Sequence, residues 1–110
     1  MAKKIRTKID WTIHAVPEEN GKICLHTHGL NEKGLIELSV LDTEEVYTTE
    51  EMSAMINNIA RMMIEGEEFV VEPKLLHVID DINGNPKFKF RMSYAECYGE
   101  KTIRLFFVKN

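Results

Sequence analysis

The chain has 110 residues, of which 44% are hydrophobic and 29% charged, and this composition excludes a disordered chain. Its length suits one domain with a single core, which we expect to span residues 1–110. Eighteen acidic and fourteen basic residues give a formal net charge of −4, which argues against nucleic-acid binding, and no apolar run approaches the roughly 20 residues of a membrane span.

The first two predicted strands form a hairpin. Residues 9–16 and 22–30 each alternate apolar and polar side chains, and the loop at 17–21 joins them. Placing Val16 opposite Lys22 predicts three further pairs, which are His14 with Cys24, Thr12 with His26, and Asp10 with His28. These side chains then share one face of the hairpin. The apolar face carries Trp11, Ile13, Ala15, Ile23, Leu25 and Thr27.

A third strand is expected at residues 35–41, and a helix follows at about residues 49–65. Thr48 and Glu51 have the spacing of a capping box, and Gly66 suits the position just after the helix. Apolar residues spaced three and four apart predict the stripe that packs on a sheet, namely Met52, Met55, Ile56, Ile59 and Met63.

Three more strands are predicted after the helix, at residues 75–80, 87–94 and 102–108. The last is so rich in β-formers that an exposed edge position would promote aggregation, so we expect it inside the sheet. This order lacks the strand–helix alternation of a parallel sheet. The predicted fold class is therefore α+β, a single domain with a largely antiparallel sheet and one main amphipathic helix packed on it.

The histidines of the hairpin are the first candidate site. His14, His26 and His28 fall on one face at distances that suit imidazole ligands of zinc, nickel or copper, with Asp10 or Cys24 as a further ligand. Neither an H-E-x-x-H motif nor a pair of closely spaced cysteines accompanies them. The alternative interpretation is a solvated strand face, or a histidine cluster covered by a loop or a second subunit.

Other polar residues suggest weaker hypotheses. Cys24 beside a histidine could act as a nucleophile, although a position within a strand argues against that role. His77 lies between apolar neighbours and is expected to be structural. The stripe formed by Lys87, Lys89 and Arg91 suits either a solvated face or an anionic small molecule.

The two cysteines, Cys24 and Cys97, are too far apart in sequence for a C-x-x-C motif. The opening residues MAKKIRTKID lack the apolar stretch of a signal peptide. We therefore expect a cytoplasmic protein with free thiols.

A Thr-x-Gly-Leu strand motif is followed by a Glu-Leu strand and a helix, and the residues that form these motifs are Thr27, Gly29, Leu30, Glu37 and Leu38. In these motifs residues 9–66 resemble a bacterial family of small domains of unknown function. His26 stands where that family often has an aromatic residue, and Leu35 and Ile36 replace a histidine and a proline. The resemblance implies an α+β fold and no established activity.

Two functions remain open from the sequence. The first is a non-enzymatic module that binds a protein partner or self-associates as a homo-oligomer. The second is a domain that binds a transition metal, or uses one for hydrolysis, through His14, His26 and His28. Any cofactor is then a metal such as zinc, and catalytic residues are not identified.

Overall fold

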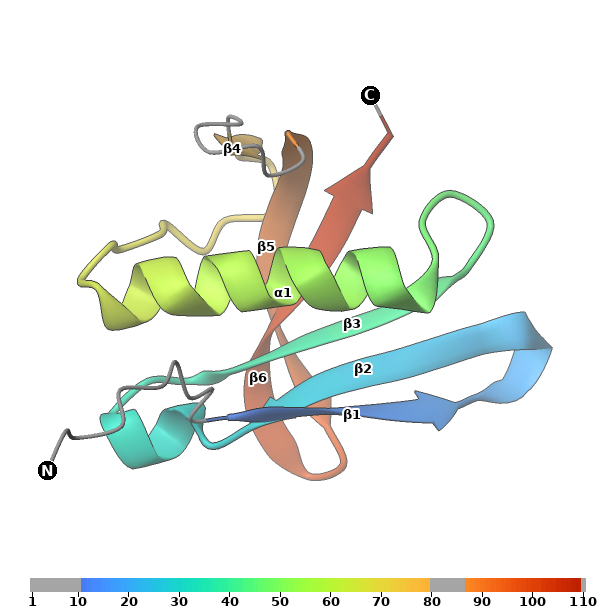
Figure 1. Ribbon diagram of the computed structural model, residues 1–110, viewed down its shortest axis with the longest axis horizontal. Coiled ribbons are helices and arrows are strands. Elements are labelled where there is room, and N and C mark those ends of the chain that lie inside the picture. Colours follow the sequence, from blue (N-terminus) through green and yellow to red (C-terminus); the bar gives the residue numbers. More distant parts are fainter. Residues whose placement is uncertain (1–10, 80–86, 110) are drawn as a thin grey trace, which may run out of the picture.

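The computed structural model describes residues 11–79 and 87–109. These residues form a six-stranded sheet in the order β1-β2-β3-β6-β5-β4, with α1 packed on one face (Figure 1). The strands are β1 (Thr12–Pro17), β2 (Lys22–His28), β3 (Glu37–Thr43), β4 (His77–Ile79), β5 (Phe88–Cys97) and β6 (Glu100–Val108). Only the β3–β6 pair is parallel among the described strands, and the other neighbours are antiparallel. The predicted α+β class with a largely antiparallel sheet is confirmed.

Helix α1 (Thr49–Ile64) begins and ends as its sequence predicts. The Thr48 side chain accepts a hydrogen bond from the Glu51 amide at 3.1 Å, and the Glu51 carboxylate accepts one from the Thr48 amide at 2.8 Å. At the other end, Gly66 donates to the Met63 carbonyl and Glu67 to that of Met62, which is the Schellman arrangement. No helix among the described residues is long and apolar enough to cross a membrane.

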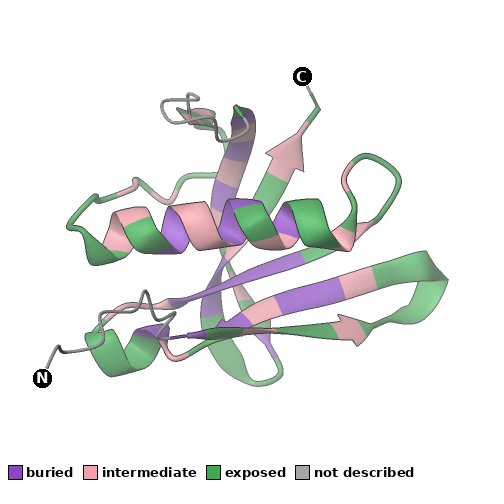
Figure 2. Ribbon diagram, viewed as in Figure 1, coloured by how far each residue is buried: buried purple, intermediate pink, exposed green. Residues whose placement is uncertain are grey.

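The core lies between α1 and one face of the sheet. Most helical residues at the predicted spacing are buried, and Met63 is partly buried against the same core. Figure 2 shows buried segments alternating with more exposed ones along α1. The core cluster includes Leu25, Leu38, Val40, Met52, Ile56, Ile59, Phe88, Phe90, Met92 and Leu105. Trp11 joins them, and its indole nitrogen donates to the Asn57 side chain at 2.9 Å.

The register of the first hairpin differs from the prediction by two residues. His14 pairs with His26, and Thr12 pairs with His28. The turn is shorter than expected because Pro17 belongs to β1, and the Glu18 amide donates to the Lys22 carbonyl across a three-residue 3-10 turn, Glu19–Gly21. A shift of two residues keeps every side chain on its predicted face, since strand side chains alternate with a period of two.

Strand β6 lies between β3 and β5, so its predicted position inside the sheet is confirmed. Strand β5 runs three residues further than predicted, to Cys97, and a two-residue turn at Tyr98 and Gly99 leads into β6. The twist of the sheet carries this β5–β6 hairpin behind β3, β2 and β1, and its turn extends past β1 (Figure 1). The opposite edge strand is shorter than predicted, because Leu75 and Leu76 precede β4, and Asp80 lies outside the described residues.

Candidate metal site

Three imidazole rings cluster on the face of the β1–β2 hairpin that points away from α1. His14 of β1 pairs directly with His26 of β2, and His28 lies two residues further along the same strand. The ring centroids of His14 and His28 are 4.3 Å apart, and His26 lies 5.3 Å from the first and 5.0 Å from the second. The predicted gathering of the three histidines is thus present in the fold.

The three rings offer nitrogen atoms that all lie within 4.8 Å of one another. His14 and His28 are exposed, whereas His26 is partly buried. Asp10, the carboxylate considered as a further ligand, lies outside the described residues.

His26 is held in its neutral form. Burial lowers its pKa below the ordinary value of 6.5, and charge on His28 or His14 would lower it further. Its Nδ1 atom is buried and has no hydrogen-bond partner among residues 11–79 and 87–109. Neutral imidazole with a free lone pair is the form that binds a metal ion.

Two thiols lie close to His26. The Sγ atoms of Cys24 on β2 and Cys97 at the end of β5 are 3.5 Å apart, and both cysteines are buried and free. Cys24, His26 and Cys97 form a second group whose ligand atoms all lie within 4.8 Å of one another. Cys97 is a site residue that the sequence analysis did not identify.

The structure argues against Cys24 as a nucleophile. Burial raises the pKa of its thiol to about 11, and the hydrogen bond and charge interaction with Cys97 act in the same direction. At neutral pH this thiol keeps its proton, whereas a nucleophilic cysteine must be a thiolate. The hypothesis of catalysis by Cys24 is therefore not supported.

Tyr98 covers the site from the turn of the β5–β6 hairpin. Its ring meets that of His26 edge-on at a centroid distance of 5.3 Å, and its hydroxyl donates to the Glu18 carboxylate in the β1–β2 loop. That carboxylate raises the pKa of Tyr98 to about 12. Tyr98 has a left-handed backbone (φ 50°) beside Gly99 (φ 82°), which suits a type I′ turn but is unusual for an aromatic residue. The turn thus places Cys97 and Tyr98 against β2.

The residues behind the family resemblance build a turn rather than a chemical site. Gly29, with φ 119°, donates its amide to the Glu37 carboxylate at 3.1 Å, and Leu30 and Asn31 donate theirs to the same group at 3.3 and 3.1 Å. These bonds satisfy the first amides of a short 3-10 helix, Leu30–Lys33. Glu37 is buried, so its role in the described structure is to hold the β2–β3 connection.

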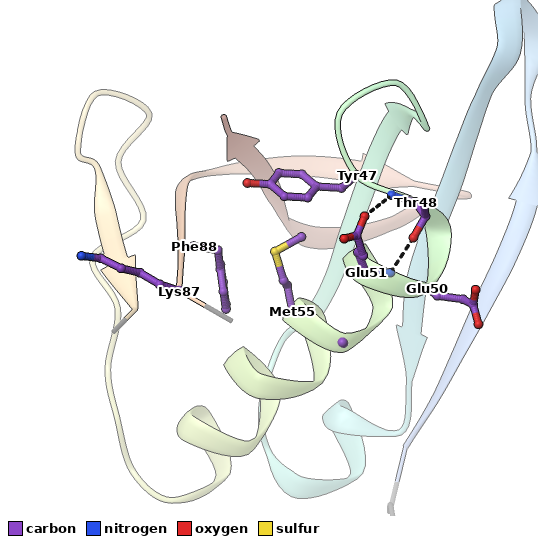
Figure 3. A pocket seen from close by; sticks show the side chains of 8 residues that line it. Tyr47, Thr48, Glu50, Glu51, Met55, Lys87 and Phe88 are labelled. Carbon is purple, nitrogen blue, oxygen red and sulfur yellow. Dashed lines mark hydrogen bonds between the residues drawn. The ribbon is translucent and has the colours of Figure 1, made fainter. Parts of the chain in front are cut away.

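A pocket of about 540 Å³ lies at the other side of the molecule, beside the start of α1 (Figure 3). Its wall is formed by Tyr47, Thr48, Glu50, Glu51, Ala54, Met55, Lys87 and Phe88. The dashed bonds in Figure 3 are those of the capping box, so the polar atoms of Thr48 and Glu51 already serve the helix. This lining contains neither histidine nor cysteine, and we do not assign chemistry to it.

Of the remaining polar candidates, His77 has a structural role, and the basic residues near β5 have different surroundings. His77 places Nε2 3.0 Å from the Val70 carbonyl oxygen and stacks on Phe90, so its structural role is confirmed. Arg91 donates to the Lys74 carbonyl at 3.0 Å, while Lys87 precedes β5 and lines the pocket. The predicted basic stripe is therefore not one uniform surface.

Residues 13–92 match a protein family described as "Protein of unknown function (DUF4026) C-terminal". The chain belongs to this family. No curated protein and no solved structure matches the chain. The family match includes all three clustered histidines and Cys24, and it ends before Cys97 and Tyr98. Membership confirms a domain of unknown function and leaves the site to be interpreted from its geometry.

Proposed function

We propose that this domain of the DUF4026 C-terminal family binds a transition metal through His14, His26 and His28. The observation that carries the proposal is the mutual approach of three imidazole nitrogens within 4.8 Å. Two adjacent antiparallel strands fix the relative positions of the backbone that carries the rings. Imidazole is a common ligand of zinc, copper and nickel, and three such ligands leave a position for water.

The charge state of the rings supports the same proposal. Three clustered imidazolium ions would repel one another, and the lowered pKa of His26 keeps at least this ring neutral near pH 7. A metal ion coordinated by the ring nitrogens would take the place of protons there, so the repulsion between imidazolium ions would not arise. Hydrolysis would also require a base, and the carboxylate of Glu18 already accepts the hydroxyl of Tyr98. We therefore propose metal binding without assigning a reaction.

Zinc titration of tag-free protein tests the proposal, because an affinity tag of histidines would mimic the signal. The wild-type chain, purified without chelator and kept reduced, should bind zinc near stoichiometrically by elemental analysis after desalting. The triple variant His14→Gln/His26→Gln/His28→Gln should lose most of this affinity and keep its circular dichroism spectrum. His77→Gln is the matched control, since His77 lies in the strand at the opposite edge of the sheet. Equal zinc binding by the wild type and the triple variant would contradict the proposal.

A second candidate function is a binding or self-associating module, which requires no metal. Ser39 and Arg104 pair on the sheet face away from α1, and two residues further along each strand Leu41 and Phe106 are 38% and 47% exposed on that face. Apolar side chains in such a position suit contact with a second copy of the chain. Light scattering across a hundredfold concentration range should reveal a dimer that Phe106→Ser weakens, whereas a constant monomer mass would contradict self-association.

The proposed location is the cytoplasm. Two buried free cysteines, 3.5 Å apart and not joined, suit a reducing compartment. Fractionation of cells that produce the protein, followed by thiol labelling of the denatured chain, tests this location.

A further inference from the structure

We propose that Cys24, Cys97 and His26 form an inner ligand set that holds a thiophilic divalent ion, zinc above all. The proposal deepens the metal-binding function above, because His26 belongs to both groups of ligands. It differs in its ligands, since the outer set, formed by His14, His26 and His28, contains only imidazoles. The inner set joins residues from β2 and the end of β5, so it exists only in the folded chain.

The spacing of the sulfur atoms fits a tetrahedral ion. Two thiolates on zinc, each at about 2.3 Å and at a tetrahedral angle, stand about 3.8 Å apart. The Sγ atoms of Cys24 and Cys97 are 3.5 Å apart, close to that separation. A linear arrangement of two thiolates with the same bond length would need roughly 4.6 Å, so the pair favours a tetrahedral site.

The cysteines are buried outside the apolar core. The core cluster beneath α1 contains neither Cys24 nor Cys97, although both are buried. Both lie instead where the β5–β6 turn covers the other face of β2, with the Tyr98 ring against His26. Packing against α1 therefore does not explain why these two positions are cysteine.

His26 supplies an independent observation. Its Nδ1 atom is buried and has no hydrogen-bond partner within the part of the chain that the structure describes. A buried polar atom without a partner costs free energy, and native proteins usually provide a partner or a bound species. A metal ion bound to this nitrogen and to the two thiols would supply the missing partner.

Metal binding at the inner set would be coupled to the release of protons from the two thiols. The two thiols would lose their protons to solvent as the metal–sulfur bonds form, and the ion would hold both sulfurs as thiolates. Three protein ligands leave zinc one further position. The exposed His14 and His28 lie beside His26 and mark the side of the cluster that solvent reaches.

Cobalt(II) distinguishes the inner set from the outer one. Cobalt occupies zinc sites, and thiolate ligation gives it a strong near-ultraviolet charge-transfer band that imidazole ligation alone does not. The reduced, full-length chain should be titrated with cobalt under anaerobic conditions, and then with zinc to displace it. Three variants accompany the wild type, namely Cys24→Ser/Cys97→Ser, His14→Gln/His28→Gln and the control His77→Gln.

We expect a stoichiometric charge-transfer band in the wild type, in the His14→Gln/His28→Gln variant and in the control, and zinc should remove the band by displacing cobalt. The serine variant should lose the band. Cobalt binding without this band, abolished by His14→Gln/His28→Gln, would overturn the inner set and support the imidazole site. Absence of binding in every chain would overturn both proposals. If the serine variant does not fold, an absent band in the reduced wild type with cobalt bound still overturns the inference.

Discussion

The hydroxyl of Thr27 donates a hydrogen bond to the carboxylate of Glu37 at 2.6 Å, and both side chains are buried. The same hydroxyl oxygen accepts from the Leu38 amide at 2.9 Å. Together with the amides of residues 29–31, the hydroxyl surrounds the carboxylate with donors. In this chain the Thr-x-Gly-Leu segment at residues 27–30 supplies donors to the Glu37 carboxylate, and the Glu-Leu segment at residues 37–38 supplies the carboxylate and an amide that donates back to Thr27.

Replacing Glu37 with Gln should destabilise the fold by about 2 to 4 kcal/mol, because hydrogen bonds to a buried charged group are among the stronger ones and an amide offers fewer acceptor sites. The glutamine NH2 group would also face backbone amides that cannot accept from it. Urea unfolding of metal-free protein, followed by circular dichroism, measures the change.

Glu32→Gln is the matched control for that substitution. Glu32 lies in the same connection but is exposed, so its replacement should change the free energy of unfolding by no more than about 0.5 kcal/mol. Equal changes in the free energy of unfolding for Glu37→Gln and Glu32→Gln would contradict a stabilising role for the hydrogen-bond network around Glu37.

The sequence predicted the helix closely because its signals are local. Thr48 and Glu51 form the expected capping box, Gly66 follows the end of the helix, and the apolar stripe is buried except for Met63, which is partly buried. Each of these features depends on residues within one or two turns of each other. The prediction therefore required no knowledge of the rest of the chain.

Replacing Thr48 with Ala should cost about 1 kcal/mol of stability, the usual effect of losing an N-cap. The hydroxyl that accepts from the Glu51 amide would be absent, leaving that amide to water. Thermal unfolding measures the loss, and Thr48→Ser should restore most of it because serine caps equally well. Equal stability of the alanine and serine variants would contradict this account of the helix start.

The site could be predicted only in part. Period-two alternation placed His14, His26 and His28 on one face. This placement was correct although the predicted register was wrong by two residues, because a shift of two leaves each side chain on the same face. Cys97 and Tyr98 could not be assigned to the site from the sequence, because they lie more than 70 residues from Cys24 along the chain. Their approach depends on the parallel pairing of β3 with β6 and on the twist of the β5–β6 hairpin, which no local pattern encodes.

Metal-free protein should lose stability as the pH falls below 6.5 because of His26. Its folded-state pKa is lowered, so the unfolded chain binds the proton more tightly than the folded one. The free energy of unfolding then decreases as the pH falls through the unfolded value of about 6.5, and the decrease from this residue ends below the lowered folded value. Urea unfolding in the presence of a chelator, from pH 8 to pH 5, measures this slope.

His26→Gln should flatten that part of the pH profile, whereas His77→Gln should leave it in place. His26 lies on β2, whereas His77 lies on β4 at the far edge of the sheet, so the comparison is specific to the cluster. An unchanged slope in His26→Gln would show that other groups determine the acid sensitivity.

Oxidation of Cys24 and Cys97 to a disulfide should prevent the inner ligand set from binding a metal ion. Glutathione disulfide accepts two electrons: a Cys24 or Cys97 thiolate attacks it, one glutathione leaves, and the second thiolate displaces the other glutathione to form the protein disulfide. The sulfurs need to approach from 3.5 Å to a bond length of about 2.05 Å. The raised pKa of Cys24, about 11, makes the thiolate scarce, so the reaction should be slow at pH 7 and faster at pH 9.

Mass spectrometry should find a loss of two hydrogens, restored by dithiothreitol, and bound zinc should slow the reaction because coordinated thiolates are shielded. Cys24→Ser should yield only a glutathione adduct on Cys97. Equal rates of disulfide formation with and without zinc would show that the ion does not engage these sulfurs.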